Sequence, residues 1–582
     1  MKTLSHNGII IPEYEPRGFS IKFKGKGIKL DPHQEEMAVA WVRKLDTPYV
    51  EDKVFIKNFF DDFCKALNVK GSVDDFDFSE IIKFVEKERE TKANMSKEEK
   101  KKLAAERKTV REKNKEIYGF AKIDGEEVAL GNYMAEPSGI FMGRGKHPLR
   151  GSWKEGAKKS DVILNLSPDA KRPSGNWKEI VWMPDCMWIT RWKDKLTGKE
   201  KYIWMADTSP MKQKREMKKF DKAMELEKKR NDIRDFIKIN LDADDEKIRK
   251  VATVCYLIET VCMRVGDEKD EDEANTVGAS TLAKNNISIE GNTVKFDFLG
   301  KDSVRWVKEI EAPDSVIRNL KEFMEGPNDL IFDGIRSEHV NEFLGNAMEG
   351  LTSKVFRTSS ATNAVKNFLS KNEVGKESSD YYKKHIAKLA NLEAAKVCNH
   401  KRTIPKSWQK SLDRKKERLE ANKIKAKKNI EKYKKKISDH TKRYEEQTKK
   451  YEVKLNEEMK KLDEYQKVGN EKRAASKKKV ITNLKKRIKN LNKKCSERQE
   501  KLKKMMEKRK QRDKEIIRKM ELQIEEQQKT KDYNLNTSLK SYIDPRAYYK
   551  WFKQSGYDWK KYYSSTLQKK FSWVEKEDAK RN

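Results

Sequence analysis

The chain has 582 residues, of which 39% are charged and 36% hydrophobic, and its formal net charge is +37. This length exceeds what one hydrophobic core supports, and so large a basic excess favours a polyanionic partner, with nucleic acid as the first candidate. The N-terminal residues lack an apolar segment, so we expect no signal peptide, and no run approaches the roughly 20 apolar residues that span a bilayer. The six scattered cysteines lack the close pairing of zinc or redox motifs.

The first two hundred residues mix turn-rich stretches with short elements. Residues 11–16 are bracketed by prolines, which favour an extended backbone. Ser96 and Glu99 form a capping box that opens a charged helix toward Lys115. Residues 130–201 carry short alternating runs broken by glycine and proline, and these predict β-strands. We therefore expect a mixed α/β region here.

The middle of the chain is predicted to be mainly helical. Residues 211–250 are charged and helical in pattern, and a buried helix over residues 248–263 is expected to end near Gly266. Its apolar face consists of Val251, Val254, Leu257, Ile258 and Val261. Residues 293–307 then alternate apolar and polar side chains around Gly300 and Lys301, which is typical of a hairpin.

Residues 407–531 contain one glycine, Gly469, and no proline, so we expect almost continuous helix. Two helices of about 60 residues each would form an antiparallel coiled coil roughly 90 Å long. Basic residues outnumber acidic ones by about two to one in this segment, so we expect one face to run near phosphates. The alternative is a plain structural spacer, which is the usual role of a coiled coil. The heptad positions are Ile430, Ile437, Tyr444, Tyr451, Ile481, Leu484, Ile488, Leu491, Cys495, Leu502 and Met505.

A glycine-rich stretch over residues 137–148 invites a nucleotide-binding interpretation. Its spacing fits neither a P-loop nor a dinucleotide-binding loop, so ATP is not implied. Glycines on both sides of an arginine do allow the backbone to approach a DNA groove closely. We therefore expect Arg144, Lys146 and His147 to contact phosphates or the minor groove.

An acidic cluster follows the predicted buried helix, at Asp267, Glu268, Asp270, Glu271, Asp272 and Glu273. It lacks calcium-loop spacing and has no second acidic cluster to complete a two-metal site, so a solvated loop is the favoured interpretation and no metal is expected. Arg264 differs from these residues. At the end of an apolar helix its guanidinium is held in place, which suits bidentate phosphate binding.

Four further residues stand in contexts that fix them, namely Lys301 at a hairpin tip, Arg357 after an apolar pair, His400 before the coiled coil, and Tyr542 before a turn. Each has an ordinary structural explanation when taken singly. A lysine at a tip is usually solvated, a histidine near a helix end is usually a cap, and a tyrosine before a turn usually packs. Spacing alone does not favour a catalytic role over these structural explanations for any of the four residues.

Together they form a recognisable pattern, and the chain resembles the archaeal and eukaryotic type IB DNA topoisomerases over nearly its full length. The N-terminal half carries IPEYEP, KNFFDDF, MSKEEK and GIFMGRGKHP, which look like the cap lobe of that family. The second half carries MRVGDEK, NTVGASTL, FDFLGKDS, MEGLTSKVFRT, CNH and TSLKSYIDPR in the family's order.

The resemblance implies a role for each candidate. Tyr542 would be the nucleophile, Arg264 and Arg357 would hold the scissile phosphate, His400 would donate a further hydrogen bond to it, and Lys301 would be the general acid. Relaxation of supercoils would then pass through a 3′-phosphotyrosyl intermediate and need neither ATP nor metal. Contacts with duplex DNA are expected at Arg144, Lys146, His147, Lys154, Asp302, Lys354 and Lys401.

The implied fold is a multidomain, mainly α protein with a mixed α/β cap, a bilobed clamp around duplex DNA and a tyrosine-recombinase-like catalytic core. The expected divisions are a cap lobe over residues 1–208, a catalytic core over 209–405, an antiparallel coiled-coil linker over 406–530 and a C-terminal domain with the nucleophile over 531–582. We expect a monomer that binds double-stranded DNA, uses no cofactor and contacts no membrane.

The sequence also departs from the family's pattern. Ser541 precedes the nucleophile where eukaryotic members commonly carry asparagine, the long charged N-terminal tail of the nuclear enzymes is missing, and the linker is longer than usual. These features favour an archaeal member located in the cytoplasm or nucleoid, whereas a eukaryotic member would be nuclear.

Two other functions compete with this interpretation. A tyrosine recombinase uses nearly the same catalytic set, but is not expected to carry this cap lobe or a coiled coil before the nucleophile. A non-catalytic coiled-coil protein that binds nucleic acid fits the basic composition, but has no need of the five catalytic candidates. Relaxation of a plasmid without ATP separates the three functions.

Overall fold

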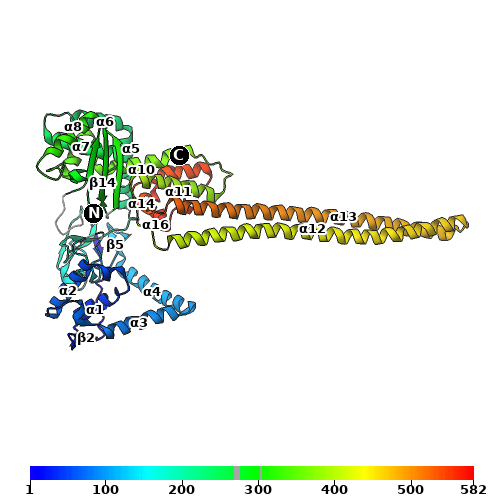
Figure 1. The fold of residues 1–582 in the computed structure, drawn as a ribbon, viewed down its shortest axis with the longest axis horizontal. Coiled ribbons are helices and arrows are strands. Elements are labelled where there is room, and N and C mark those ends of the chain that lie inside the picture. Colours follow the sequence, from blue (N-terminus) through cyan, green and yellow to red (C-terminus); the bar gives the residue numbers. More distant parts are fainter. Residues whose placement is uncertain (144, 146, 268–275, 302–303, 582) are drawn as a thin grey trace.

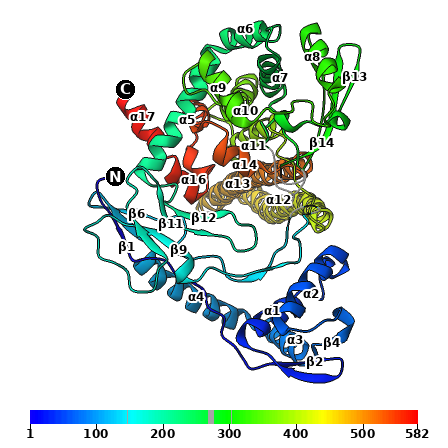
Figure 2. The ribbon, with the colours of Figure 1, turned by 90° about the vertical axis from the view of Figure 1, so that its left-hand side faces the viewer.

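The structure is a computed structural model that describes residues 1–143, 145, 147–267, 276–301 and 304–581. Figure 1 shows an N-terminal lobe, a second lobe above it, and a pair of very long helices that project from the second lobe. Viewed along those helices, the two lobes together form a C shape (Figure 2). The mainly helical, bilobed architecture with a long helical linker confirms the predicted fold class.

The N-terminal lobe combines helices with small sheets, as its turn-rich sequence predicts. The helices are α1 (Pro32–Val42), α2 (Lys53–Leu67), α3 (Ser79–Asn94) and α4 (Lys97–Tyr118). One sheet contains β1 (Leu4–His6), β5 (Phe120–Ile123) and β6 (Glu126–Ala129). A second contains β2 (Ser20–Phe23), β3 (Lys26–Lys29) and β4 (Phe76–Asp77). A third pairs β7 (Gly139–Ile140) with β8 (Trp153–Lys154).

The largest sheet of this lobe has the order β10-β9-β11-β12. Its strands are β9 (Val162–Asn165), β10 (Glu179–Val181), β11 (Trp188–Lys193) and β12 (Glu200–Trp204). The predicted capping box is confirmed, because the Glu99 amide donates to the Ser96 hydroxyl over 3.1 Å and the Ser96 amide donates to the Glu99 carboxylate over 2.7 Å. The helix that follows, α4, has no buried residue, as its charge predicts.

A buried carboxylate fixes the extended segment at residues 11–19 against helix α1. Glu35 is fully buried and accepts hydrogen bonds from the backbone amides of Arg17, Gly18 and Phe19 over 2.7–2.9 Å. The hydroxyl of Tyr14 also donates to it over 2.7 Å. Four donors therefore stabilise one charge that water does not reach.

The second lobe is built from helices around one three-stranded sheet. The helices are α5 (Pro210–Lys228), α6 (Arg230–Asn240), α7 (Glu246–Val261), α8 (Asp314–Glu325), α9 (Ser337–Ala347), α10 (Ser353–Lys371) and α11 (Asp380–Val397). The sheet has the order β13 (Ile287–Glu290), β14 (Thr293–Gly300) and β15 (Val304–Glu311). The predicted hairpin is confirmed, because Gly300 pairs with Val304 at its tip.

The buried helix of the sequence prediction is α7, and all five residues of its predicted apolar face are buried. Its predicted end near Gly266 is wrong, because the helix stops at Val261. Cys262 adopts a left-handed conformation with φ of 56°, which turns the chain out of the helix. Periodicity cannot reveal this stop, since Cys262 and Met263, which follow directly, are also apolar.

The C-terminal segment packs onto the second lobe. Its helices are α14 (Leu535–Ser541), α15 (Pro545–Ser555), α16 (Ser565–Lys570) and α17 (Trp573–Arg581). One hydrophobic cluster joins these helices to α10 and α11, with Tyr548, Phe552 and Phe571 fully buried in it. The C-terminal segment is therefore part of the same rigid core as the predicted phosphate-binding residues.

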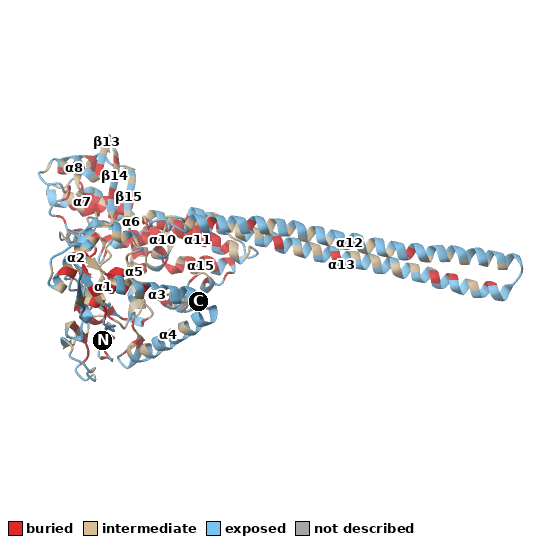
Figure 3. Cartoon of the chain, turned by 60° about the horizontal axis from the view of Figure 1, so that its bottom comes forward, coloured by how far each residue is buried: buried red, intermediate tan, exposed pale blue. Residues whose placement is uncertain are grey.

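The long helices are α12 (Trp408–Lys467) and α13 (Glu471–Lys529), which confirms the predicted antiparallel pair. Gly469 has φ of 73° and makes the turn between them. Burial is concentrated in the lobes, whereas the linker is exposed along most of its length (Figure 3). Ile481, Leu484 and Leu502 are buried in its seam, but Met505 is exposed, so the predicted heptad position of Met505 is wrong.

No helix within the described ranges is long and apolar enough to cross a membrane.

Replacing Glu35 by glutamine is expected to destabilise the N-terminal lobe. The new amide group presents N–H donors to backbone N–H donors, so at least one buried group loses its partner, at a cost of about 2 kcal/mol or more. Native-state hydrogen exchange of peptides from α1 should report this loss. Glu15→Gln, at an exposed carboxylate in the same segment, is the control. Equal protection in both variants would contradict the role assigned to Glu35.

Candidate active site

Four of the five predicted catalytic residues meet in the second lobe, although they come from four separate segments. Arg264 follows α7, Arg357 lies on α10, His400 follows α11, and Tyr542 ends α14. The ring centroids of His400 and Tyr542 are 5.0 Å apart, and the Arg357 guanidinium carbon lies 5.4 Å from the centroid of the Tyr542 ring. Arg264 is close enough to act electrostatically on both His400 and Tyr542.

The guanidinium of Arg357 is buried, with 4% of the residue exposed. One terminal nitrogen donates to the carbonyl oxygen of Cys398 over 2.8 Å and the other donates to the carbonyl oxygen of Cys262. Those carbonyls lie at the C-terminal ends of α11 and α7, where the helix dipole is negative. The remaining buried nitrogen, Nε, has no partner within the described structure.

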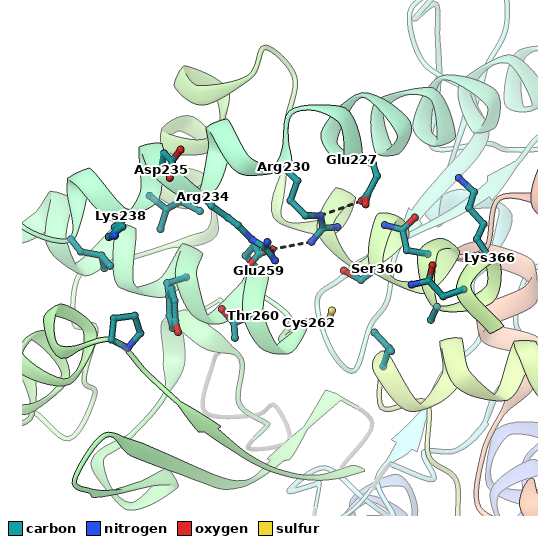
Figure 4. A pocket seen from close by; sticks show the side chains of 18 residues that line it. Glu227, Arg230, Arg234, Asp235, Lys238, Glu259, Thr260, Cys262, Ser360 and Lys366 are labelled. Carbon is teal, nitrogen blue, oxygen red and sulfur yellow. Dashed lines mark hydrogen bonds and ion pairs between the residues drawn. The ribbon is translucent and has the colours of Figure 1, made fainter. Parts of the chain in front are cut away.

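A network of ion pairs supports α10 from α6 and α7. Glu259 of α7 is bound by Arg230 and Arg234 of α6 over 2.9 Å each. Arg230 also donates to the hydroxyl of Ser359, two residues after Arg357, over 3.0 Å. Figure 4 shows Arg230 between Glu227 and Glu259 at the wall of a cavity of about 720 Å³. The helix that carries Arg357 is therefore tied to α6 and α7.

His400 is placed by a left-handed residue and a serine. Asn399 has φ of 50°, a conformation that asparagine tolerates better than most residues, and it turns the chain after α11. The Nδ1 atom of His400 lies 2.7 Å from the hydroxyl of Ser538 on α14. The other ring nitrogen, Nε2, is buried and has no partner among the described residues.

Burial and the nearby charges of Arg357 and Arg264 lower the pKa of His400 to about 3. The imidazole is therefore neutral near pH 7 and carries one N–H. In the tautomer in which the Ser538 hydroxyl donates to Nδ1, the hydrogen is on Nε2, so an unpaired donor faces the site.

The backbone around Tyr542 is anchored to α10 and α5. The hydroxyl of Thr362 on α10 donates to the Tyr542 carbonyl over 3.3 Å and accepts from the Asp544 amide over 3.0 Å. The ammonium of Lys219 on α5 donates to the Ser541 carbonyl over 2.9 Å. These contacts fix the peptides on both sides of the tyrosine, so the position of its ring is set by the lobe.

The phenol of Tyr542 differs from its neighbours in pKa. Burial alone would raise its pKa, but the charges of Arg357 and Arg264 outweigh burial and hold it below the ordinary value of about 10. Burial raises the pKa of Tyr533, Tyr548 and Tyr549. Among these four tyrosines, Tyr542 is the one whose surroundings favour the phenolate.

Lys301, the fifth predicted catalytic residue, is not brought against the other four. It is exposed at the tip of the β14–β15 hairpin, and it forms no ion pair within the described structure. The hairpin is nevertheless tied to the His400 turn, because the Asn399 side chain donates to the Arg305 carbonyl over 3.3 Å. On the same hairpin Lys308 donates to the Val261 carbonyl over 2.8 Å, and burial lowers its pKa.

The predicted DNA contacts have different surroundings. Arg144, Lys146 and Asp302 lie outside the described residues. Lys354 and Lys401 are exposed, and the His147 ring packs edge-on against Phe141 at 4.9 Å.

Lys154 is held inside the N-terminal lobe. Its ammonium pairs with the buried carboxylate of Asp194 over 2.9 Å and with Glu136. These partners leave 18% of its side chain exposed, and they raise its pKa although burial opposes them. Its charge is therefore already compensated by the protein.

The acidic cluster predicted as a solvated loop falls largely outside the described residues. Asp267, its first member, accepts a hydrogen bond from the Ser337 amide over 3.0 Å. Within the described ranges no group of three or more histidine, cysteine or acidic residues is arranged to hold a metal ion.

Sequence reasoning missed the residues that position the site, namely Thr362, Lys219, Lys308 and Ser538. The first three are far from Tyr542 in sequence, and no local pattern marks them. Ser538 could have been found from its spacing in the sequence. It lies four residues before Tyr542, so in a helix it is on the same face.

Comparison with known families gives three matches. A model described as eukaryotic DNA topoisomerase I, DNA binding fragment, matches residues 1–205. The catalytic core of the same family matches residues 208–437, and a C-terminal topoisomerase domain matches residues 514–581.

Similar proteins come from a plant, a yeast and an animal. DNA topoisomerase 1 beta of Arabidopsis thaliana is 36% identical over 419 residues, covering 70% of this chain and 45% of the relative. DNA topoisomerase 1 of Candidozyma auris is 36% identical over 446 residues, covering 73% and 59%. The Homo sapiens protein of that name is 34% identical over 444 residues, covering 72% and 57%.

The chain thus spans about half the length of the curated relatives it matches. The sequence-based preference for an archaeal member has no support, because the matching models and these relatives are eukaryotic. The residue at Ser541 and the long linker are local differences, whereas the similarity to these relatives extends over 70–73% of the chain.

The imidazole of His400 is expected to remain neutral well below the pH at which a free imidazole titrates. In a chain labelled with ¹⁵N-histidine, the His400 signals, assigned with a His400→Gln variant, should stay constant from pH 8 to pH 5 and show hydrogen on Nε2. Protonation should begin only as the pH falls toward about 3. Ser538→Ala should shift the tautomer equilibrium, whereas Thr537→Ala should not. Titration of His400 near pH 6.5 would contradict the environment described here.

Proposed function

Because the chain belongs to the eukaryotic DNA topoisomerase I family, we propose that it relaxes supercoiled duplex DNA by cutting and resealing one strand. One observation carries this proposal. Two buried nitrogens, Arg357 Nε and His400 Nε2, have no partner in the described structure, and both groups adjoin the ring of Tyr542. Buried donors are normally paired, so unpaired donors beside a phenol with a lowered pKa indicate a site for an anionic ligand.

A DNA phosphate suits these donors. In the proposed reaction Tyr542 first loses its proton to water, which its lowered pKa favours. The phenolate oxygen then attacks phosphorus, and the bond from phosphorus to the 5′-oxygen breaks. Negative charge grows on the two nonbridging oxygens, where Arg264, Arg357 and His400 can donate hydrogen bonds. The phosphotyrosine bond at the 3′ end keeps the energy of the broken phosphodiester, so reversal of the reaction reseals the strand without ATP.

The leaving oxygen needs a proton, and we assign that role to Lys301. A lysine ammonium can protonate the departing 5′-oxygen and recover the proton during resealing. Its place on a hairpin tied to the His400 turn supports this role. Because the Lys301 side chain is exposed, the bound DNA must supply the remaining contacts that hold it.

Duplex DNA is the proposed partner of both lobes. We propose that Lys354, Lys401 and His147 contact the duplex, together with Arg144 and Lys146. For Asp302, whose carboxylate can only accept hydrogen bonds, we propose a contact with DNA groups other than phosphate. The compensated charge of Lys154 favours a structural role for that residue within the N-terminal lobe. One chain supplies all five proposed catalytic residues, so the proposed active form is a monomer that works in the nucleus, as the eukaryotic relatives suggest.

Tyr542→Phe is expected to leave folding and DNA affinity unchanged while relaxation falls by at least about a thousandfold. The change removes one oxygen and keeps the ring that packs beneath Arg357. Plasmid relaxation and a binding titration on the same duplex measure the two effects. Tyr533→Phe is the matched control, since it removes a phenol oxygen nine residues away.

Denaturing the wild-type reaction should trap protein joined to the 3′ end of the nicked strand. Peptide mapping should then place the link at Tyr542 and the free hydroxyl at the 5′ side. Relaxation by Tyr542→Phe, or an adduct at Tyr533, Tyr548 or Tyr549, would show that the mechanism is wrong.

Relaxation is also expected to proceed in excess EDTA, without ATP, on both positive and negative supercoils. The reason is that two guanidiniums and an imidazole N–H supply the stabilising charge and hydrogen bonds that a divalent cation supplies in two-metal enzymes. The measurement is the rate of plasmid relaxation with and without EDTA. An absolute requirement for Mg²⁺ would instead direct attention to the acidic cluster at residues 267–273.

A further inference from the structure

A second concave site lies where the long helices α12 and α13 join the second lobe. It is a cavity of about 760 Å³ between the first turns of α11, the start of α12 and the end of α13, and we call it the linker-root pocket. Its charged lining includes Lys384 of α11, Arg402 before α12, Lys415 of α12 and Lys519 of α13, together with Asp380 and Glu526. It is remote in sequence from Tyr542 and has no part in the proposed reaction.

The acids of this pocket already have partners, but most of its cations do not. Glu526 accepts from Lys388 over 2.7 Å and from His385 over 3.2 Å, and Asp380 pairs with Lys561 over 3.2 Å. Lys384, Arg402, Lys415 and Lys519 form no ion pair within the described ranges. Four cations around one cavity are therefore not held in ion pairs by the protein.

Two further groups in the pocket are unsatisfied. The indole N–H of Trp408 and the side-chain oxygen of Gln527 are buried and have no hydrogen-bond partner among the described residues. Trp408 is also the first residue of α12, a 60-residue helix whose N-terminus has no side-chain cap. The indole N–H of Trp408 can only donate, and the start of α12 is positive. These two features add to the attraction for an anion.

The electrostatics of Lys415 agree with this description. Burial and the nearby charge of Lys388 lower the pKa of Lys415, although Glu526 opposes them. A cation whose charged form is disfavoured in the free protein gains most from a bound anion.

We propose that the linker-root pocket binds a phosphate-bearing anion that bridges α11, α12 and α13. Phosphate oxygens accept several charge-assisted hydrogen bonds at once, which suits four cations and an indole N–H around one cavity. The source is either a small free polyphosphate or the backbone of bound DNA. In either case the anion ties both linker helices to α11, the helix whose C-terminal carbonyl holds Arg357, and so fixes the linker relative to the active site.

Calorimetric titration of the full chain with tripolyphosphate, without DNA and at physiological salt, tests the proposal. One saturable site is expected. Lys415→Ala with Lys519→Ala should weaken binding by at least about tenfold, because each cation removed takes away charge-assisted hydrogen bonds. Trp408→Phe keeps an aromatic side chain but removes the indole N–H with its five-membered ring, so it should weaken binding by a smaller factor.

Lys450→Ala with Lys494→Ala is the matched control. These two lysines line a smaller basic groove farther out on the coiled coil, which has no residue from the catalytic lobe and no indole. The control removes the same charge from the same long linker. Absence of saturable binding, or equal weakening by both double variants, would overturn the proposal, because binding would then reflect only the general positive charge.

Repeating the titration with a short duplex present identifies the source of the phosphate. Unchanged tripolyphosphate affinity indicates a free anion, and competitive displacement indicates that the DNA backbone occupies the pocket. None of these measurements depends on strand cleavage. The outcome therefore remains informative even if the proposed relaxation activity fails its own test.

Discussion

The structure around the candidate site depends on the burial of one guanidinium. Arg357 keeps its charge inside the second lobe because the carbonyl oxygens of Cys262 and Cys398 accept from it. Both carbonyls are available only because α7 and α11 end at those points, Cys262 in a left-handed conformation and α11 just before the left-handed Asn399. A buried charge without such partners is costly, so two helix ends and α10 are fixed together by one side chain.

This arrangement explains why the site forms from segments far apart in sequence. The helix ends that bind Arg357 lead directly into Arg264 and His400, so the residues whose carbonyls accept from the guanidinium also position the other two groups. Thr362, on the same helix as Arg357, holds the backbone of Tyr542. One packed helix therefore sets the positions of all four residues, and disturbing its support at Arg230 and Glu259 would affect each of them.

Local chemistry made much of the fold predictable. The capping box at Ser96, the hairpin at Gly300 and the long helical pair around Gly469 each depend on residues close in sequence, and each is confirmed. The end of α7 was missed because a left-handed cysteine has no sequence signal, and Met505 was misplaced because the long helices drift from a strict heptad. The compensation of Lys154 by Asp194 links residues forty positions apart, which composition cannot reveal.

The catalytic candidates emerged from family motifs, and the structure adds a physical reason for one choice among nineteen tyrosines. Burial disfavours a phenolate, and near Tyr549 the carboxylate of Asp578 strengthens that effect. At Tyr542 the nearest charges are positive, and they reverse the direction of the shift. Burial and the same two guanidiniums keep His400 neutral, so the charges that make the phenol more acidic also favour an imidazole that can donate without carrying charge. The proposed nucleophile and the proposed phosphate-binding histidine thus respond to the same two arginines, which no described carboxylate compensates.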